Sequence, residues 1–554
     1  MKKFYVLIVS IFLIFGIVAC AEDTTTNMIT INNQTTSFQT TNSTSTTVTN
    51  TTEVIFQLAA LSEEEITLEF WHAFSSSQEE LLNERILEFE AIYPNININA
   101  TNKGDYDQLS YALTSSVLGG LSPNAFAGDA LIISELNYSN QLLKLDKYLN
   151  SNIVYDIDNV NSTEYGESYT LGYDLNNIFT ELAERNNMGD SGYVALPLYF
   201  QTEVVIANID ILKAHVTEIR NSGVTISNNG HISLDNPLTY NQLELLNLIL
   251  VDSSGTNLTN MQTEYLMNYD FVSNLFLNTS RQWDLNVNDA AGNLFVHDDE
   301  TISMLQYLDT LFTNNTLALP SAWDQSYGST NFKQGDVALS VTRSNELRYN
   351  IPTVNDPQES LKLGIFNIDV LPVPQYTAFQ GEEITVNEVT FNSNQSASYE
   401  SISVGIFDQD QSDEELMSYI FMKFLMNDDF LAELSLLKNY FPATFSAYNS
   451  QGLIEISATD SMSYEEFIAI ANDYWDNDGV VTWDSEDIRW VYLYNSMAAN
   501  IALDQCDIYY KYPYFATGLG LDDYKIFIDD LNDCLENICN GVYTPIQALE
   551  EVMD

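Results

Sequence analysis

Basic residues are scarce in this sequence: 19 Lys and Arg stand against 78 Asp and Glu in 554 residues, and the formal charge is -59. A surface this acidic repels phosphate backbones and anionic lipid headgroups, so nucleic acid is a poor partner. The same charge argues mildly against an anionic ligand, although a local pocket can override the global field. We expect most of the carboxylates to form a solvated surface.

Cysteine is also rare, and the chain contains only Cys20, Cys506, Cys534 and Cys539. The three that follow Cys20 are an odd number near the C-terminus, so they define no disulfide framework. One bridge remains possible, but Cys534 and Cys539 lie on a single predicted helix. The sequence therefore fixes no connectivity.

The motifs of common enzymes and metal sites are absent. The sequence has no H-E-x-x-H, no G-x-S-x-G elbow and no G-x-x-x-x-G-K-[ST] loop. A calcium loop around "DNDG" fails because Tyr474 and Ser485 occupy its first and last ligand positions. The histidines form no close pair for zinc: His72, His215, His231 and His297. We predict no catalytic residue, metal or cofactor, but carboxylates are so numerous that a glycosidase dyad stays open.

The N-terminus has the layout of a secretion signal. Lys2 and Lys3 precede an apolar run over residues 4–18, and "IVAC" leads into Cys20. This pattern resembles a bacterial lipoprotein signal, in which residues 1–19 are removed and Cys20 carries lipid, including palmitate. The mature protein would then be tethered to the outer face of the cytoplasmic membrane. An uncleaved membrane anchor is the alternative.

Residues 20–62 begin with this cysteine and are rich in Thr, Asn and Ser. They show almost no apolar periodicity, so they cannot bury enough surface to offset the entropy of ordering. We expect a flexible linker here. An adhesive or modified low-complexity segment is the alternative.

The remainder of the chain has the pattern of an α/β protein. In "ITLEFWH", Ile66, Leu68 and Phe70 alternate as in a half-buried strand. Ser77 and Glu80 predict a capping box for a helix that Pro94 stops, and a second alternating strand follows. This strand–helix–strand unit builds parallel sheets. Further helices are predicted over residues 105–118, 239–250, 301–312, 414–425 and 543–552.

A series of fragments in fixed order carries a family resemblance. The series is "ITLEFWHAF", "GDYDQLSYALTSSVLGGLSPNAF", "ALPLYFQTEVVIANIDIL", "NPLTYNQLELL", "FKQGDVALSV", "KNYFPATFSA" and "NGVYTPIQALEEV". Together they resemble the family 1 extracellular solute-binding proteins, the lipid-anchored receptors of sugar-type ABC importers that include the maltose-binding protein. Each fragment alone is weak, but their order is specific.

The resemblance implies a two-lobed, periplasmic-binding-protein-like α/β fold with discontinuous lobes, a hinge and a central cleft. It places the first lobe at 64–200 plus 372–438 and the second at 201–371 plus 439–554. The chain is long for this family. We expect the extra length near residues 150–190, 375–400 and 505–527.

The first strand and its neighbours supply candidate ligand-binding residues. Trp71 and His72 end the first strand, at the carboxyl edge where open parallel sheets bind ligands. The alternatives are a Trp packed under the helix and a structural His. Ser75 could present a hydroxyl or backbone N–H to a ligand. Asp129 ends a second strand, where the family often has a polar ligand contact, but it could be a simple turn carboxylate.

Further candidates come from the implied crossing between lobes and from the C-terminal part. Tyr199 and Glu203 should face the cleft, with a buried hinge cluster as the alternative. Tyr440 resembles the family's Gly-Tyr-x-Pro turn, although Asn439 replaces the Gly. Trp483 and Trp490 could form one helical stripe, as a ligand platform or as core. Arg343 stands where the family often has a stacking aromatic, so it could pair an acidic ligand group.

These features predict a receptor without enzymatic activity. Sugars offer apolar ring faces and a rim of hydroxyls, which aromatic platforms and polar side chains recognise. We predict a monomer that captures an oligosaccharide or related polyol and passes it to the permease subunits of an ABC transporter. A glycerol-phosphate-like ligand is one alternative. A surface glycosidase or adhesin lipoprotein is the other.

Overall fold

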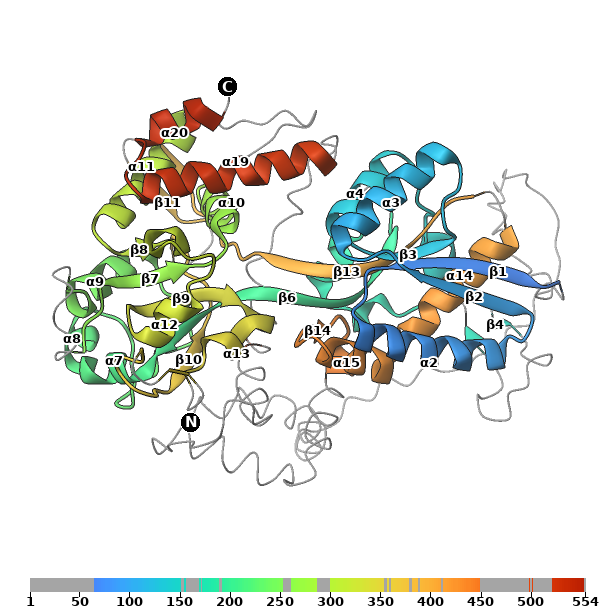
Figure 1. Cartoon of the computed structure of the whole chain (residues 1–554), viewed down its shortest axis with the longest axis horizontal. Coiled ribbons are helices and arrows are strands. Elements are labelled where there is room, and N and C mark those ends of the chain that lie inside the picture. Colours follow the sequence, from blue (N-terminus) through green and yellow to red (C-terminus); the bar gives the residue numbers. More distant parts are fainter. Residues whose placement is uncertain are drawn as a thin grey trace, which may run out of the picture.

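The computed structural model places two α/β lobes side by side (Figure 1). It describes residues 64–448 except 151–153, 156–168, 171, 189–191, 253–260, 286–298, 353–355, 358–359, 378–380, 387–388 and 410–411, together with 498, 501 and 521–552. The predicted signal peptide, Cys20, the linker, Trp483 and Trp490 lie outside the described residues. Within the described residues, no helix is both long and apolar enough to cross a membrane.

The sheet of the first lobe is built on β1 (Ile66–His72), as the alternation predicted. This strand pairs in parallel with β2 (Ile96–Asn102) and β3 (Ala125–Asp129). Its inward residues Leu68 and Phe70 are buried. The longer helices that cover this lobe in the described part of the chain are α2 (Ser76–Ile92), α3 (Tyr106–Gly119), α4 (Ala130–Tyr138), α14 (Ser412–Leu425) and α15 (Asp428–Leu436).

The predicted start of α2 was wrong by two residues. Ser75 is the N-cap and forms a capping box with Gln78. The sequence had predicted a capping box formed by Ser77 and Glu80. The Gln78 side chain accepts from the Ser75 backbone N–H at 3.2 Å and donates to the backbone oxygen of Leu434 at 3.3 Å. Because this second contact is a tertiary one, the sequence of the helix alone could not choose between the two registers.

Two long strands join the lobes. The 14-residue β6 (Ala195–Asn208) is buried along its whole length and spans roughly 45 Å. Its first half pairs with β13 (Tyr399–Ile406) and with β14 (Phe441–Pro442). Its second half pairs with β9 (Val337–Arg343) and β10 (Ile368–Leu371). One mixed sheet therefore runs through both lobes in the order β2-β1-β3-β13-β6-β9-β7-β8.

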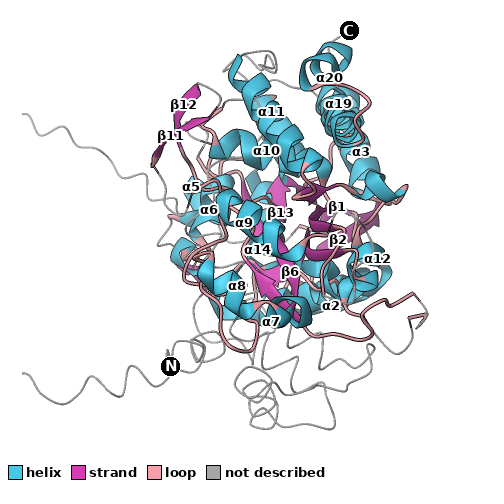
Figure 2. Cartoon of the chain, turned by 90° about the vertical axis from the view of Figure 1, so that its left-hand side faces the viewer, coloured by secondary structure: helices cyan, strands magenta, loops and turns pink. Residues whose placement is uncertain are grey.

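The second lobe extends this sheet with parallel strands β7 (Tyr265–Tyr269) and β8 (Leu317–Ala318). In the turned view, helices lie above and below the sheet in three layers (Figure 2). The helices of this lobe are α7 (Ile209–Ala214), α9 (Tyr240–Leu250), α10 (Val272–Gln282), α11 (Asp299–Thr313), α12 (Ser329–Gln334), α19 (Leu521–Cys539) and α20 (Pro545–Val552). All five further helices predicted from periodicity are present, and none of their ends is shifted by more than two residues.

The shorter elements lie mostly in connections. They are α5 (Asp146–Leu149), β4 (Val154–Tyr155), β5 (Tyr169–Thr170), η2 (Leu175–Asn177), α6 (Thr180–Arg185), α8 (Val216–Asn221), η5 (Pro320–Trp323), η6 (Ser344–Glu346), α13 (Leu347–Asn350), β11 (Glu383–Val386) and β12 (Val389–Asn392). The hairpin of β11 and β12 falls within the segment 375–400, where we expected extra length.

Packing assigns two segments differently from the sequence-based lobe limits. Val373 and Ala397 belong to the core of the second lobe, and Phe391 stacks on the buried Trp283 there at 4.6 Å between ring centroids. The sequence had placed residues 372–398 in the first lobe. Conversely, Phe441 lies in the first core and pairs with β6, whereas the sequence had placed it in the second lobe.

Candidate functional site

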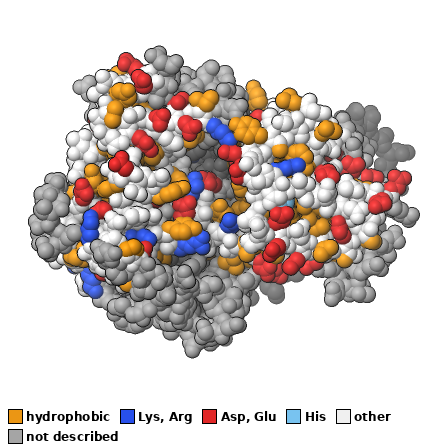
Figure 3. Space-filling model, viewed as in Figure 1, with side chains coloured by type: hydrophobic (Ala, Val, Ile, Leu, Met, Phe, Trp, Pro, Cys, Tyr) orange, Lys and Arg blue, Asp and Glu red, His pale blue; other side chains and the backbone are white. Residues whose placement is uncertain are grey.

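The carboxyl ends of parallel strands from both lobes point toward the two crossing strands. In the first lobe, β1 leads to Ser75 and β3 ends at Asp129. In the second lobe, β7 leads to Asp270 and β9 ends at Arg343. The molecular surface is hollowed between the lobes, with basic and acidic side chains around the hollow (Figure 3). This is the edge at which open α/β sheets bind ligands, and the candidate site therefore lies here.

Trp71 is half-buried at the end of β1, and one face of its ring is occupied. The Lys103 Nζ lies 3.6 Å from the ring centroid, and the indole packs against the cluster of α3 and α4. A cation over an aromatic face contributes a favourable electrostatic contact. The ring is thus held in place by the protein, and that face is closed to a ligand in this conformation.

His72 is fully buried, with no exposed side-chain area. Its ring lies between Phe70 and Phe74, with centroids 6.1 and 5.1 Å away. Nδ1 accepts the Phe74 backbone N–H at 3.2 Å, and burial lowers the pKa of His72 to about 4. The imidazole is therefore neutral at pH 7, and this placement agrees with the structural alternative rather than with ligand contact.

Ser75 and Asp129 both cap helices that follow strands. The Ser75 hydroxyl lies 3.1 Å from the Oε1 of Gln78, and Asp129 accepts the Ile132 backbone N–H at 3.0 Å. Capping therefore accounts for part of the hydrogen-bonding capacity of each residue. Both remain partly exposed at the carboxyl edge of the sheet, where a ligand can reach them.

Three tyrosines form a cluster on the wall of the first lobe. The hydroxyls of Tyr106 and Tyr199 are 2.9 Å apart, and Tyr199 stacks on Tyr440 with centroids 4.8 Å apart and an interplanar angle of 20°. Tyr199 is buried, whereas Tyr106 and Tyr440 are half-buried. The sequence missed Tyr106, although it is the Tyr of the quoted "GDY" fragment. Tyr106 and Tyr440 are the members that a ligand can touch.

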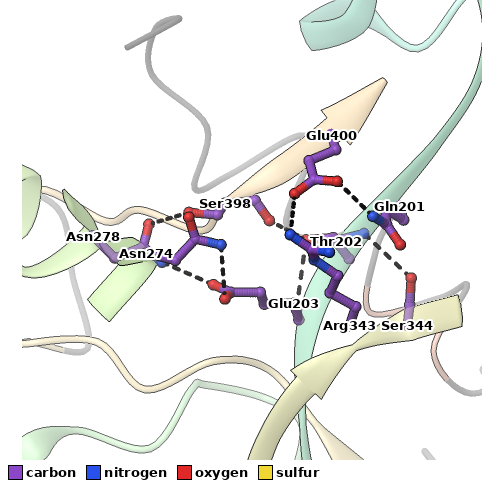
Figure 4. Close-up of polar contacts among 9 residues, drawn as sticks. All are labelled: Gln201, Thr202, Glu203, Asn274, Asn278, Arg343, Ser344, Ser398 and Glu400. Carbon is purple, nitrogen blue, oxygen red and sulfur yellow. Dashed lines mark hydrogen bonds and ion pairs between the residues drawn. The ribbon is translucent and has the colours of Figure 1, made fainter. Parts of the chain in front are cut away.

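Arg343 projects from the end of β9 and is paired within the protein (Figure 4). Its guanidinium lies 2.6 Å from the Glu400 Oε1 of β13 and 3.8 Å over the Phe271 ring centroid. The Gln201 amide of β6 donates to the other Glu400 oxygen at 2.7 Å. The sequence missed Glu400, because nothing local marks it as the partner of an arginine on another strand. Arg343 and Glu400 are both partly exposed.

Glu203 sits in a closed polar cage on the second half of β6 (Figure 4). The carboxylate is 1% exposed and accepts from Asn274, Asn278 and Tyr269 at 3.0 to 3.1 Å. Burial raises the pKa of Glu203 to about 7, while the bonds from Asn274 and Tyr269 and the charge of Arg343 oppose the rise. Asn278 in turn accepts from the Ser398 hydroxyl at 3.1 Å. This cage ties β6 to α10 and to the start of β13, as the hinge alternative predicted.

Two more carboxylates surround Arg343 at the edge of the second lobe. Asp270 follows β7 and accepts the Gly328 backbone N–H at 2.6 Å. Glu346, in η6, is half-buried. Burial raises the pKa of both carboxyls, and the charge of Arg343 opposes this rise at each. Burial likewise raises the pKa of Tyr440, with Glu400 and Glu346 adding to the rise and Arg343 opposing it.

An exposed tyrosine adjoins this edge. Tyr327 is 61% exposed and precedes Gly328, whose backbone passes so close to β7 that a Cβ would lie 1.9 Å from the Asn268 Nδ2. A larger residue at position 328 would displace the Asn268 amide. The sequence missed Tyr327, since no motif surrounds it, and it is a further candidate for stacking on a sugar ring.

No metal-binding group of three or more His, Cys, Asp or Glu occurs among the described residues. The walls instead offer aromatic rings, carboxylates and amides with one guanidinium. Such groups bind polar ligands through stacking and hydrogen bonds.

Comparison with known proteins agrees with this architecture. A family model described as bacterial extracellular solute-binding protein matches residues 84–462. No curated protein matches the sequence. A solved family 1 extracellular solute-binding protein from Alicyclobacillus acidocaldarius is similar, with 15% identity, a TM-score of 0.55 and coverage of 89% of this chain and 98% of that one.

Two further solved structures share the fold. The sugar-binding protein MalE of Xanthomonas citri has 14% identity and a TM-score of 0.54, covering 88% of this chain and 95% of that one. UgpB of Mycobacterium tuberculosis, solved in complex with glycerophosphocholine, has 13% identity and a TM-score of 0.52, covering 88% and 96%. At these identities the likeness supports the two-lobed fold, which the sequence had predicted.

Proposed function

Since the chain belongs to the bacterial extracellular solute-binding proteins, we propose that it captures a neutral oligosaccharide or related polyol between its lobes. On this proposal it delivers the ligand to the permease of an ABC importer and performs no catalysis. Lipid attachment at Cys20, which rests on the sequence pattern alone, would hold the receptor beside the permease.

The pairing of Arg343 is the observation that carries the choice of ligand. A receptor for a phosphate-bearing solute needs a cation that is available to the ligand. Here Glu400 already neutralises Arg343 at 2.6 Å, and Asp270 and Glu346 lie in the same electrostatic environment. A phosphate would meet an excess of negative charge, whereas sugar hydroxyls can donate to each carboxylate. This favours a neutral ligand over the glycerol-phosphate alternative.

The wall of the first lobe supports the same ligand class. Tyr106 and Tyr440 present half-buried rings beside the polar groups of the second lobe, and sugar rings pack their apolar faces on such rings. The Xanthomonas citri neighbour is a sugar-binding protein. Trp483 and Trp490, which lie outside the described residues, remain predicted additions to this platform.

A thermal-shift screen tests the proposal. The mature chain, with Cys20 replaced by Ser to avoid lipidation, would be mixed with maltotriose and other oligosaccharides, polyols, glycerol phosphate, glycerophosphocholine and short peptides. We expect an oligosaccharide or polyol to raise the melting temperature, because a ligand that binds only the folded state stabilises it. Stabilisation by phosphate compounds alone would overturn the neutral-ligand proposal.

Each stabilising compound would then be incubated with the protein and analysed for products. Recovery of intact ligand supports the receptor. Release of shorter saccharides would instead support the glycosidase alternative, and the two outcomes are separated in one chromatographic run.

A further inference from the structure

The N-terminal end of α19 reaches from the second lobe to the first (Figures 1 and 2). Its Lys525 Nζ lies 2.8 Å from the Asp107 Oδ1 in the first turn of α3. The same Nζ lies 4.8 Å from the ring centroid of Tyr111, one helical turn further along α3. This contact joins the lobes at a place separate from β6 and β13.

The anchoring of α19 explains why Lys525 can reach across. Phe527, Leu531, Leu535 and Ile538 form a buried stripe at helical spacing in the core of the second lobe. The neighbouring Ile526 is 59% exposed. Lys525 precedes the buried Phe527 by two residues and lies against α3.

The two helices differ in the charge that their N-terminal ends favour. The N-terminal end of a helix carries a partial positive charge, which disfavours a cation in the first turns. Asp107, by contrast, stands where the dipole of α3 favours an acid. In a chain with 19 basic residues, Lys525 has two favourable partners on the opposite lobe, the Asp107 carboxylate and the Tyr111 ring.

The contact is also adjacent to the candidate binding site. Tyr106, whose hydroxyl is 2.9 Å from that of Tyr199, directly precedes Asp107 in the first turn of α3. A ligand that packs on Tyr106 thus fixes the same turn that presents Asp107 to Lys525. Ligand binding and the contact between lobes favour each other through one rigid element.

We propose that Lys525, Asp107 and Tyr111 form a latch that holds the two lobes closed and so sets the affinity of the receptor. The latch rests on the proposed function, since a receptor that closes over its ligand gains affinity in proportion to the population of its closed state. Lys525 acts on the ligand only through the position of the lobes. Its contribution is expected to be modest, about three- to tenfold in the closed-to-open ratio, because both charged groups are partly exposed.

Small-angle X-ray scattering of the ligand-free mature chain tests the latch without any ligand. Lys525→Gln and Asp107→Asn should each increase the radius of gyration, and the double variant should add little to either. The charge-swapped pair Lys525→Asp with Asp107→Lys should return the radius toward the wild-type value. Lys213→Gln, which removes an exposed lysine from α7, is the matched control and should leave the radius unchanged.

A salt titration is a second, independent test, because exposed ion pairs are screened at high ionic strength. Raising sodium chloride from about 0.05 to 1 M should open the wild type toward the radius of Lys525→Gln and leave that variant unchanged. Equal radii for all variants at low salt, with matching melting temperatures, would overturn the latch. The latch would also be overturned if the effects of Lys525→Gln and Asp107→Asn on the radius added up in the double variant.

Titration with maltotriose measures how the latch changes the affinity for a ligand. If it binds, Lys525→Gln should weaken binding by about three- to tenfold at low salt and by less than twofold at 1 M. If maltotriose binds no variant while scattering still shows the latch, the choice of ligand fails and the latch stands. If it binds all variants equally, the latch fails and the choice of ligand stands.

Discussion

The two walls of the site are built from different chemistry. The first lobe contributes tyrosine rings, Tyr106 and Tyr440, and its carboxylate Asp129 is engaged in capping a helix. The second lobe contributes Asp270 and Glu346 around the single guanidinium of Arg343. The half-buried rings thus lie mainly on the first wall, and the charged groups mainly on the second. A ligand that needs both must draw the lobes together, so the division of chemistry couples recognition to closure.

The largest effect is expected on the free energy of unfolding, and it comes from the polar cage around Glu203 beneath the second wall. Burial raises the pKa of Glu203 from 4.5 to about 7, so the folded protein holds a proton that the unfolded chain releases above about pH 4.5. Below that pH, this carboxyl contributes its full stabilisation of the folded state, about 3 kcal/mol. The contribution is lost as the pH rises through about 7. Urea unfolding at pH 5 and pH 8 measures it.

Replacing Glu203 with Gln should remove this part of the pH dependence of the free energy of unfolding. Glu218→Gln, at an exposed position of α8, controls for the loss of one carboxylate and should retain the wild-type dependence. The cage is misassigned if wild type and Glu203→Gln lose the same free energy between the two pH values.

The second largest effect should follow from removing the guanidinium of the second wall. Arg343→Gln leaves Glu400, Asp270 and Glu346 without their cation, and we expect about a 100-fold loss of ligand affinity by calorimetry. Arg348→Gln removes an exposed arginine from nearby α13 and should change affinity less than twofold. Improved binding of a cationic sugar by Arg343→Gln would sharpen the assignment, whereas unchanged affinity would contradict it.

A smaller effect is expected from the aromatic wall. Tyr440→Ala removes the ring that stacks on Tyr199, and we expect about a tenfold weaker affinity from lost stacking area. Tyr138→Ala removes a ring that is 59% exposed on α4 and serves as the control. If Tyr440→Ala lowers the melting temperature but spares affinity, the tyrosine cluster is core rather than ligand platform.

The smallest effect on binding should come from Trp71. The Lys103 contact closes one face of the indole, so Trp71→Ala should weaken ligand binding by less than about threefold while lowering the melting temperature by a few degrees. A loss of affinity that exceeds the loss of stability would instead place the ring in the site. Calorimetric titration and a melting curve on one preparation decide between the two.

Local pattern predicted much of the scaffold. Leu68 and Phe70 alternate along β1 and are buried, because a strand with one buried face requires a period of two. The position of Asp129 at the carboxyl edge was predictable from the same elements, whereas Arg343 was proposed only from the family resemblance. Tyr106 was within reach, since it lies in the quoted "GDY" fragment.

The sequence could not predict contacts between side chains from distant segments of the chain. Glu400 meets Arg343 only because β6 lies between β13 and β9, and no spacing in the sequence encodes that order. The start of α2 at Ser75 depends on the contact of Gln78 with Leu434. His72 read as a candidate at a strand end, but its burial depends on Phe74 and the first core. Sequence pattern predicts which residues lie at the carboxyl edge of the sheets, and tertiary packing decides which of their side chains are exposed there.

The place of β13 in the sheet has a consequence for how the chain acquires its fold during export. This strand lies between β3 and β6 of the first lobe, yet it begins 270 residues after the end of β3 and 191 residues after the end of β6. A chain that emerges N-terminus first exposes the edges of β3 and β6 until the entire middle of the second lobe has passed. Unpaired edges invite association with other chains, and pairing across such distances is slow. The first lobe is therefore the first to emerge and among the last to be completed.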